Sequence, residues 1–271
     1  MTESGHHARP SPVRTLHEYV LLYLGLGYLG TICLLWTPIA MLLHPVLPSG
    51  AGRRLGRLFI NHGFNAYIRF LTLIGACRFD LAALDSLRGQ GPLILAPNHP
   101  CLLDAVMVIS RLPDVVCIMK AGLMDNIFLG AGARLARYIR NDAPLRMVGR
   151  ATEDLAAGSF LLVFPEGTRT IRLPVNPLMS SVGLISRRAK VPIQTIFIET
   201  ASPYLCKGWP LFRKPEMPVT YRVRLGKRFD PPASVQPFMA ELERYFAAEL
   251  AHAVLPDLPV GTDGGASSPN A

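Results

Sequence analysis

The sequence has few charged residues for its length. Asp, Glu, Lys and Arg make up 17% of its 271 residues, whereas an ordinary soluble domain carries about 25%. Half of the residues are hydrophobic, which excludes a largely disordered, collagen-like or coiled-coil protein. At about 150 residues per domain, the length predicts one large domain or two small ones. The shortage of charge indicates that part of the chain contacts lipid.

Cysteines and acidic residues are also scarce. The five cysteines are odd in number and none has Cys-x-x-Cys spacing, which argues against a disulfide framework and a zinc site and favours a reducing compartment. There are 19 acidic against 28 basic residues, a net charge of +9. Such a surplus favours anionic partners. Because no nucleic-acid-binding signature is present, we expect no nucleic acid but an anionic lipid surface or a phosphate-bearing substrate.

An uncharged segment of 34 residues lies between Glu18 and Arg53, and only His44 interrupts its apolar character. Its most apolar part runs from Tyr19 to Leu35, and the segment is long enough for the roughly 20 residues that a bilayer-crossing helix needs. A secretory signal peptide would have an apolar region of about 7–15 residues and a small-residue cleavage site. We therefore expect a retained membrane anchor.

A second apolar stretch, residues 58–76, predicts a half-inserted or interfacial helix. One span and a re-entrant helical pair are both compatible with this pattern, and a buried core helix is the alternative. More arginines follow the apolar segment than precede it, which predicts an inner or cytoplasmic membrane location with the folded domain facing the cytoplasm. The expected organisation is an N-terminal tail (1–18), membrane-anchoring helices (19–76), a folded domain (77–255) and a disordered tail (256–271).

After residue 77, short apolar runs alternate with helical stretches. The expected strands cover residues 92–96, 115–119, 160–164 and 193–198, and the expected helices cover residues 102–111, 128–139, 151–157 and 178–188. This alternation predicts an α/β fold with a layered, mostly parallel sheet flanked by helices. Residues 219–225 alternate between apolar and polar, which predicts a late strand with one exposed side, and residues 238–253 have helical periodicity.

A histidine and an aspartate follow the first expected strand, five positions apart. Pro100 favours the start of a helix, which leaves His99 in the preceding turn and Asp104 in the opening turns of that helix. The imidazole can then fold back onto the carboxylate and act as a general base. The alternatives are a helix-capping turn with no catalytic role, and a nucleophilic Cys101, although a cysteine here is more often a packing residue.

A second polar turn follows the strand expected at residues 160–164. Pro165 and Gly167 predict a tight turn that lets a ligand approach the backbone. Glu166 and Arg169 should emerge at the same sheet edge as the histidine. An arginine offers a planar fork for phosphate, and the glutamate could accept from a hydroxyl or orient the arginine. The alternative is a surface ion pair of little energetic value.

These segments resemble the glycerolipid acyltransferase family, which includes 1-acylglycerol-3-phosphate acyltransferases. The resemblance covers about residues 80–230 and rests on the order and spacing of Asn98-His99 with Asp104 and of Phe164-Pro165-Glu166-Gly167-Thr168-Arg169. Val191-Pro192-Ile193 resembles a later segment of the family. The segment Tyr138-Ile139-Arg140-Asn141 departs from the family's Phe-Ile-Asp-Arg pattern.

The resemblance implies an acyltransferase domain at 77–255. It implies acyl transfer from a thioester, acyl-CoA or acyl carrier protein, to the hydroxyl of a lysophospholipid such as 1-acylglycerol-3-phosphate at the membrane bilayer. It also implies that His99 is the general base, that Asp104 holds its imidazole, and that no metal or redox cofactor is needed. The substrate-binding residues implied are Asn98, Glu166, Gly167, Thr168, Arg169 and Pro192, the last as part of the pocket wall.

Other functions stay open at this point. The acceptor could be a different lipid, such as a specialised glycolipid or polyene. The same histidine and aspartate could activate water in a thioester or ester hydrolase, although the sequence lacks the G-x-S-x-G elbow of the usual serine version. An inactive membrane scaffold is the remaining possibility.

Overall fold

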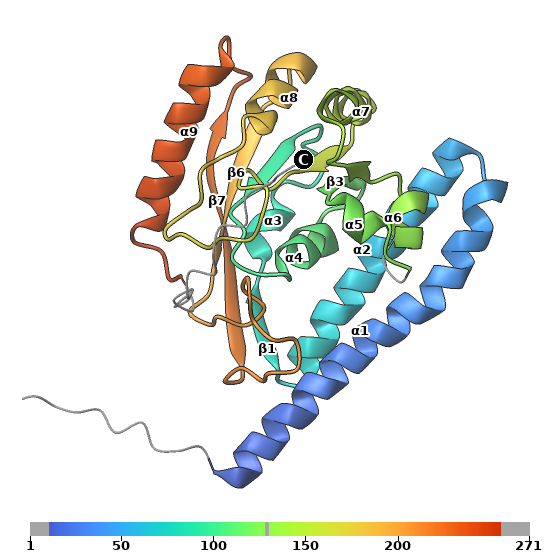
Figure 1. Ribbon diagram of the computed structural model, residues 1–271, viewed down its shortest axis with the longest axis vertical. Coiled ribbons are helices and arrows are strands. Elements are labelled where there is room, and N and C mark those ends of the chain that lie inside the picture. The colour runs from blue at the N-terminus through green and yellow to red at the C-terminus, as the bar shows by residue number, and fades with distance from the viewer. Residues whose placement is uncertain (1–10, 128–129, 256–271) are drawn as a thin grey trace, which may run out of the picture.

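A seven-stranded sheet with helices on both faces forms the centre of the protein (Figure 1). The structure is a computed structural model that describes residues 11–127 and 130–255. The tail predicted at 256–271 therefore lies outside the described residues. The strands are β1 (Cys77–Asp80), β2 (Ile94–Pro97), β3 (Val115–Met119), β4 (Ile139–Arg140), β5 (Phe160–Leu162), β6 (Ile193–Glu199) and β7 (Val219–Phe229). The helices are α1 (Pro12–Val46), α2 (Ser49–Leu73), α3 (Ala82–Asp85), α4 (Asp104–Arg111), α5 (Ala121–Met124), α6 (Gly130–Leu135), α7 (Pro144–Ala156), α8 (Ser181–Ala189) and α9 (Val235–Leu250).

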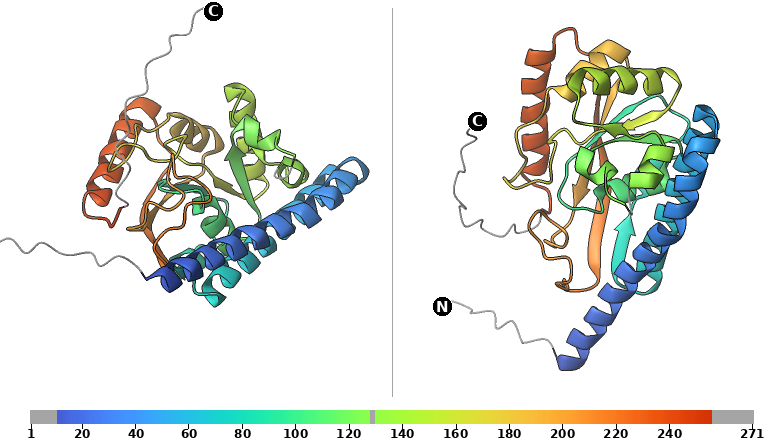
Figure 2. Two further views of the ribbon diagram at one scale, coloured as in Figure 1. Left: turned by 60° about the horizontal axis from the view of Figure 1, so that its bottom comes forward. Right: turned by 45° about the vertical axis from the view of Figure 1, so that its right-hand side comes forward.

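The sheet is mostly parallel, as the sequence predicted. Its strand order is β1-β7-β6-β2-β5-β3-β4, and only the β6–β7 pair is antiparallel. Strands β2 to β6 therefore point the same way, and their C-terminal ends meet at one edge, which we call the catalytic edge because the residues expected to be catalytic follow β2. Helix α4 covers one face of the sheet with α2, while α7, α8 and α9 pack side by side on the other (Figures 1 and 2). Every residue of β2 and β5 is buried.

Most of the expected elements are present, and the differences lie at their ends. Residues 128–139 were expected to be one helix, but α6 ends at Leu135 and Ile139 begins the short strand β4. Helix α7 begins seven residues earlier than expected, at Pro144, because proline fits the first position of a helix. Strand β7 alternates buried and exposed residues over its first five positions, which confirms the strand with one exposed side.

Helices α1 and α2 form an antiparallel hairpin beside the sheet domain (Figure 2). Helix α1 is continuous over 35 residues, about 52 Å at 1.5 Å per residue. The Trp36 and Phe59 rings stack with centroids 3.8 Å apart, and those of Tyr28 and Phe70 lie 4.2 Å apart. Within the described residues, α1 is the one helix long and apolar enough to cross a membrane, a test that a core helix or a signal sequence also passes.

Helix α1 packs against protein with one face, at residues 18–25 and 36–40, and exposes the opposite face. Leu22, Gly25 and Ala40 are buried against the rest of the protein. The opposite face exposes large apolar side chains at helical spacing, and we call it the outer stripe: Val13, Leu16, Val20, Leu24, Leu34, Leu35 and Leu42. Because one face packs against protein at residues 18–25 and 36–40, lipid would not reach this helix evenly from all sides, as it would an isolated span.

A buried arginine fastens α2 to the sheet domain. Arg57 is 2% exposed, and its guanidinium donates to the Asp154 carboxylate at 2.7 Å and to Ser159 Oγ at 2.8 Å. It also donates to Asp114 Oδ1 at 2.8 Å and to the backbone oxygen of Ala136 at 3.1 Å. All these acceptors belong to segments at least 57 positions away in the sequence, so one side chain ties the hairpin to three loops of the domain.

Helix α2 also supports the helix that carries the expected catalytic aspartate. The last carbonyl groups of a helix have no partner within it. At the C-terminal end of α4, Asn61 Nδ2 donates to the oxygens of Ile109 and Leu112, at 2.6 and 3.1 Å, and Asn65 Nδ2 donates to that of Ser110 at 3.2 Å. The position of Asp104, at the other end of α4, is thus fixed by contacts with the hairpin.

Candidate active site

Two turns meet at the catalytic edge, one after β2 and one after β5. These strands are neighbours in the sheet, so the turns lie side by side. Asn98, the first residue after β2, is buried, and its amide donates to the backbone oxygen of Ile198 at 3.0 Å and accepts from the Ile198 N–H at 2.7 Å. Asn98 therefore locks the end of β2 to β6, and its side chain faces the sheet.

The His99 imidazole lies against the Asp104 carboxylate. The distance from Nδ1 to Oδ2 is 2.8 Å, Asp104 is fully buried, and the His99 side chain keeps 16% of its surface exposed. An ionised carboxylate can only accept hydrogen bonds, so the contact places a proton on Nδ1 and leaves the Nε2 lone pair free. The ring of Phe164 stacks on the imidazole with centroids 3.9 Å apart. The position of the His99 imidazole and its tautomer are thus both constrained.

The segment between the two residues is a turn, which corrects the expected helix start at Pro100. Helix α4 begins at Asp104 itself, whose carboxylate reaches back over the turn. Its Oδ2 accepts from the Cys101 N–H at 2.8 Å, and its Oδ1 accepts from the Cys101 thiol at 3.0 Å. These contacts hold the carboxylate in place while leaving it in contact with the imidazole.

Cys101 is a hydrogen-bond donor in this arrangement. The thiol is buried, and burial, together with the neighbouring Asp104 charge, raises its pKa well above the ordinary value. A thiol that keeps its proton is a poor nucleophile. The geometry therefore favours the packing and hydrogen-bonding role of Cys101 over the nucleophilic one.

Glu166 joins the two turns. Its Oε1 accepts from the His99 N–H at 2.9 Å, its Oε2 accepts from the Asn176 N–H at 2.9 Å, and the Thr170 hydroxyl lies 2.9 Å from both oxygens. Burial raises the pKa of this carboxyl, and the hydrogen bonds partly offset that effect. Its acceptors are engaged by the protein, so Glu166 acts as a clamp that fixes the backbone of His99.

Arg169 and Gly167 complete the second turn. Arg169 does not pair with Glu166. Instead its Nη1 donates to the backbone oxygens of Leu205 and Cys206, at 2.9 and 2.7 Å, while its Nε and Nη2 make no hydrogen bond within residues 11–127 and 130–255. Gly167 has φ +66°, which favours glycine; a Cβ there would also come within 2.2 Å of Met179 Sδ, so the exposed Met179 side chain would have to move. Thr168, between them, is half-buried.

Pro192 is the expected site residue that the structure does not bring to this edge. It precedes β6, and its backbone oxygen accepts from the N–H of Ile94, the first residue of β2. Because β6 and β2 are parallel, Pro192 lies at the opposite edge, about 20 Å along the strand from the catalytic edge at 3.3 Å per residue. Its expected place in the wall of the same pocket is wrong, since strand direction separates the two ends.

The basic residue of the departing segment is also remote. Arg140 ends β4, three strand spacings from β2 in the sheet order, or about 14 Å. Its guanidinium donates to Asp125 at 2.7 Å and to Asp142 at 2.9 Å. These carboxylates occupy the side chain, whereas Arg169 lies in the turn after β5, the strand next to β2.

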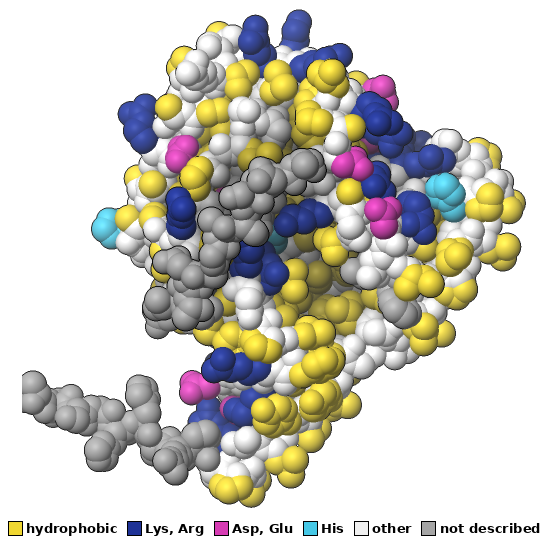
Figure 3. All heavy atoms as spheres, viewed as in Figure 1, with side chains coloured by type: hydrophobic (Ala, Val, Ile, Leu, Met, Phe, Trp, Pro, Cys, Tyr) yellow, Lys and Arg dark blue, Asp and Glu magenta, His cyan; other side chains and the backbone are white. Residues whose placement is uncertain are grey.

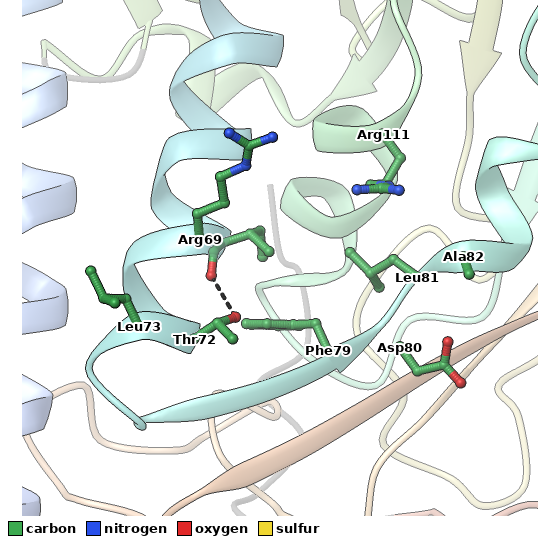
Figure 4. Close-up of a pocket in the computed structure, with 9 residues that line it drawn as sticks. Arg69, Thr72, Leu73, Phe79, Asp80, Leu81, Ala82 and Arg111 are labelled. Carbon is green, nitrogen blue, oxygen red and sulfur yellow. Dashed lines mark hydrogen bonds between the residues drawn. The ribbon is translucent and has the colours of Figure 1, made fainter.

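A hollow of about 510 Å³ lies elsewhere in the molecule, among the C-terminal end of α2, β1 and the end of α4. Figure 4 shows Arg69 and Arg111 extending towards it from α2 and α4. None of the expected site residues lines it. Among the residues that the structure describes, no three His, Cys, Asp or Glu side chains gather as potential metal ligands.

Several contributors to the site could not be identified from the sequence. The roles of Cys101, Thr170 and Asn176 depend on hydrogen bonds across turns, and that of Phe164 depends on ring stacking. Cys101 and Phe164 at least lie within the two motifs. No signal in the sequence indicates Asn176, which is ten positions from the carboxylate it donates to.

The Cys101 thiol should adjust the basicity of the histidine through Asp104. Replacing it by alanine removes one hydrogen bond to a buried carboxylate, worth about 1 kcal/mol, and concentrates negative charge on Asp104. The imidazolium is then favoured over the neutral base, so the acid limb of the pH–rate profile should move to higher pH and activity on that limb should fall by at most about fivefold. Cys101→Ser keeps a donor and should retain the native profile. Identical profiles for both variants and the native protein would rule this role out.

Comparisons with known proteins agree with the geometry. Residues 78–199 match the family described as Acyltransferase. A 1-acyl-sn-glycerol-3-phosphate acyltransferase of Pseudomonas aeruginosa is 22% identical over 228 residues, covering 79% of each chain. The crystal structure of the 1-acyl-sn-glycerophosphate (LPA) acyltransferase PlsC from Thermotoga maritima has a TM-score of 0.65 at 17% identity, covering 88% of this chain and 96% of that one. At that identity the structural likeness shows the fold.

Proposed function

This chain belongs to the glycerolipid acyltransferase family, and on that premise we propose that it transfers a fatty acyl group from a thioester to the hydroxyl of a lysophospholipid such as 1-acylglycerol-3-phosphate. The donor is acyl-CoA or acyl carrier protein. The observation that carries the proposal is the 2.8 Å contact between His99 Nδ1 and Asp104 Oδ2 at the catalytic edge, with a phosphate-binding type of side chain, Arg169, on the adjoining turn.

The proposed reaction needs no covalent enzyme intermediate. His99 Nε2 takes the proton of the acceptor hydroxyl as its oxygen attacks the thioester carbonyl carbon. The resulting tetrahedral intermediate collapses, the carbon–sulfur bond breaks, and the imidazolium returns the proton to the departing thiolate. Asp104 stabilises the imidazolium in between. General-base catalysis of this kind contributes about 10²–10⁴-fold, and positioning and oxyanion stabilisation supply the remainder.

Arg169 is the residue best suited to bind the polar head of the acceptor. Two of its three nitrogens are not used by the described residues, and the third is held by the oxygens of Leu205 and Cys206. A guanidinium that is fixed at one end and free at the other can form a charge-assisted pair with phosphate without first losing much side-chain entropy. Thr168 and the backbone of Gly167 adjoin it. Asn98 and Glu166 contribute indirectly, because their hydrogen bonds hold the end of β2 and the backbone of His99 in place.

The hairpin is the proposed attachment to the bilayer. The outer stripe of α1 offers apolar side chains to lipid, while the opposite face is packed against protein. This pattern favours a helical pair lying within one leaflet over a single span, and the larger number of arginines after the apolar segment favours the cytoplasmic side of the inner membrane. A lysolipid acceptor lies in that membrane, so a site beside the hairpin meets it at the interface.

Acceptor dependence tests the activity. We expect purified protein in detergent to release free thiol from acyl-CoA or acyl carrier protein only when a lysolipid is present, with 1-acylglycerol-3-phosphate preferred in a panel of lysolipids. Mass spectrometry of the lipid product checks the transfer. Thiol release without an acceptor would indicate a thioester hydrolase, and transfer to a glycolipid in preference to every lysophospholipid would overturn the proposed acceptor.

A further inference from the structure

The connection between β6 and β7 lies beside the N-terminal half of α1 (Figures 1 and 2). We call residues 200–218 the β6–β7 loop. Lys214 of this loop forms an ion pair with Glu18, a buried residue of α1, and the Met217 N–H donates to the same carboxylate at 3.4 Å. The Phe212 ring stacks on that of Tyr23 with centroids 6.3 Å apart. The loop is therefore attached to the hairpin by both charge and aromatic contact.

The tip of the loop exposes apolar and basic side chains together. Leu211 is 46% exposed and Phe212 is 63% exposed. The guanidinium of Arg213 lies 4.8 Å from the centre of the Trp209 ring, whose Nε1 donates to the Arg213 backbone oxygen at 3.0 Å. The β6–β7 loop carries three basic residues, Lys207, Arg213 and Lys214, and one acidic residue, Glu216. Because Lys214 pairs with Glu18, the exposed apolar groups lie in a setting with a small excess of positive charge, which comes from Lys207 and Arg213.

This tip continues the outer stripe of α1. Phe212 contacts Tyr23, and Tyr23 and its neighbours Val20 and Leu24 are all about half exposed. Hydrophobic side chains gather over α1 on the face seen in Figure 3. An apolar surface that joins the candidate anchor helix to a loop with basic side chains at the Tyr23–Phe212 contact is complementary to an anionic bilayer, whose interface accommodates Trp and Phe rings and attracts Lys and Arg.

The inner end of the loop reaches the candidate active site. Arg169 donates to the backbone oxygens of Leu205 and Cys206, and the oxygen of Leu205 also accepts from the Leu102 N–H at 3.2 Å. Leu102 belongs to the turn between His99 and Asp104. Only two residues separate Cys206 from Trp209, so a membrane contact at the tip would be connected to both turns of the site.

We propose that the tip of the β6–β7 loop, residues 209–213, is a second lipid-contacting element that enters the interface of an anionic bilayer next to α1. This inference rests on the proposed attachment of the hairpin to membranes. The two contacts together would fix the tilt of the sheet domain, whereas α1 alone would leave it free to rotate about the helix axis. The fixed tilt keeps Arg169 turned towards lipid headgroups.

Tryptophan fluorescence tests the contact directly. The chain has two tryptophans, Trp36 and Trp209, so a full-length Trp36→Phe variant reports the loop alone. With vesicles of phosphatidylcholine and phosphatidylglycerol, we expect its emission to shift to shorter wavelength and to be quenched when the lipid chains are brominated. Flotation of the same vesicles measures membrane binding separately. Protein that floats without quenching would overturn the loop contact and leave the hairpin attachment intact, whereas protein that does not float would overturn both.

Charge substitution tests the consequence for activity. The double variant Leu211→Glu with Phe212→Glu should lower transfer to a lysolipid in anionic vesicles about tenfold, with little change for the same lysolipid in detergent micelles. Leu184→Glu is the control, because Leu184 is similarly exposed (43%) on α8, at the far end of the molecule (Figure 1). An equal loss in vesicles and micelles, or an equal loss in the control, would overturn the proposal.

Discussion

Replacing His99 by alanine is expected to lower kcat/KM for acyl transfer by about 10²–10⁴-fold. The imidazole is held by Asp104 on one side and by the Phe164 ring on its face, so Nε2 points in a fixed direction when the acceptor hydroxyl arrives. No other histidine of the described residues lies in the two turns. The measurement is initial rates of thiol release in the presence of a lysolipid, at several pH values.

Two companion variants make this result specific. Asp104→Asn should cause a loss of similar size, because an amide can donate to Nδ1 and would then leave the imidazole in the tautomer that carries its proton on Nε2. His62→Ala is the matched control, since His62 is an exposed histidine of α2 whose ring forms a hydrogen bond with the backbone oxygen of Leu58, outside both turns of the site. A His99→Ala protein with native turnover would refute the proposed mechanism.

Replacing Arg57 by methionine is expected to lower the free energy of unfolding by about 3 kcal/mol. Methionine has a similar length but no donor, so the variant removes the bonds that Arg57 donates to the Ala136 oxygen, Ser159, Asp114 and Asp154. Ser159 keeps its bond to Asp114, and among the described residues Asp154 keeps Arg53 as its charged partner. Breaking a buried ion pair from one side is costly because the remaining charge stays buried. Denaturant titration in detergent, followed by circular dichroism, measures the change.

The Arg53→Met variant distinguishes the effect of losing a buried ion pair from the effect of losing one positive charge near Asp154. Arg53 contacts the same Asp154 at 3.3 Å, but its side chain is 32% exposed. Ion pairs of that kind contribute about 0–1 kcal/mol, so this variant should unfold within about 1 kcal/mol of the native protein. If the two variants lost equal stability, the total charge around Asp154, and not the buried network of Arg57, would hold the hairpin in place.

The central sheet could be predicted from the sequence because its parallel strands are buried on both sides and appear as continuous apolar runs. Strands β1 and β4 could not, since they have four and two residues and no distinctive pattern. The long apolar helix was equally evident, but which of its faces packs against protein depends on residues distant in the sequence. The 19–76 and 77–255 boundaries stay predictions.

The candidate site followed from the sequence as far as its two turns. That His99 and Asp104 touch depends on the turn at Cys101, which was wrongly expected to be helical. The partners of Arg169 are two backbone oxygens 36 and 37 positions away. Every residue has a backbone oxygen, so the sequence does not indicate which of them accept from Arg169. The place of Pro192 was predicted wrongly for a related reason. A motif shows which residues are close along the chain, but the direction of the strand decides at which edge of the sheet the motif lies.

The two outermost strands of the sheet have a practical consequence for handling the protein. An exposed sheet edge promotes aggregation when it is long and flat. Strand β4 offers two residues and β1 four, too few to template pairing between molecules. We expect self-association in solution to arise chiefly from the bare apolar side of the first helix, so a mild detergent that coats that helix should keep the enzyme monodisperse.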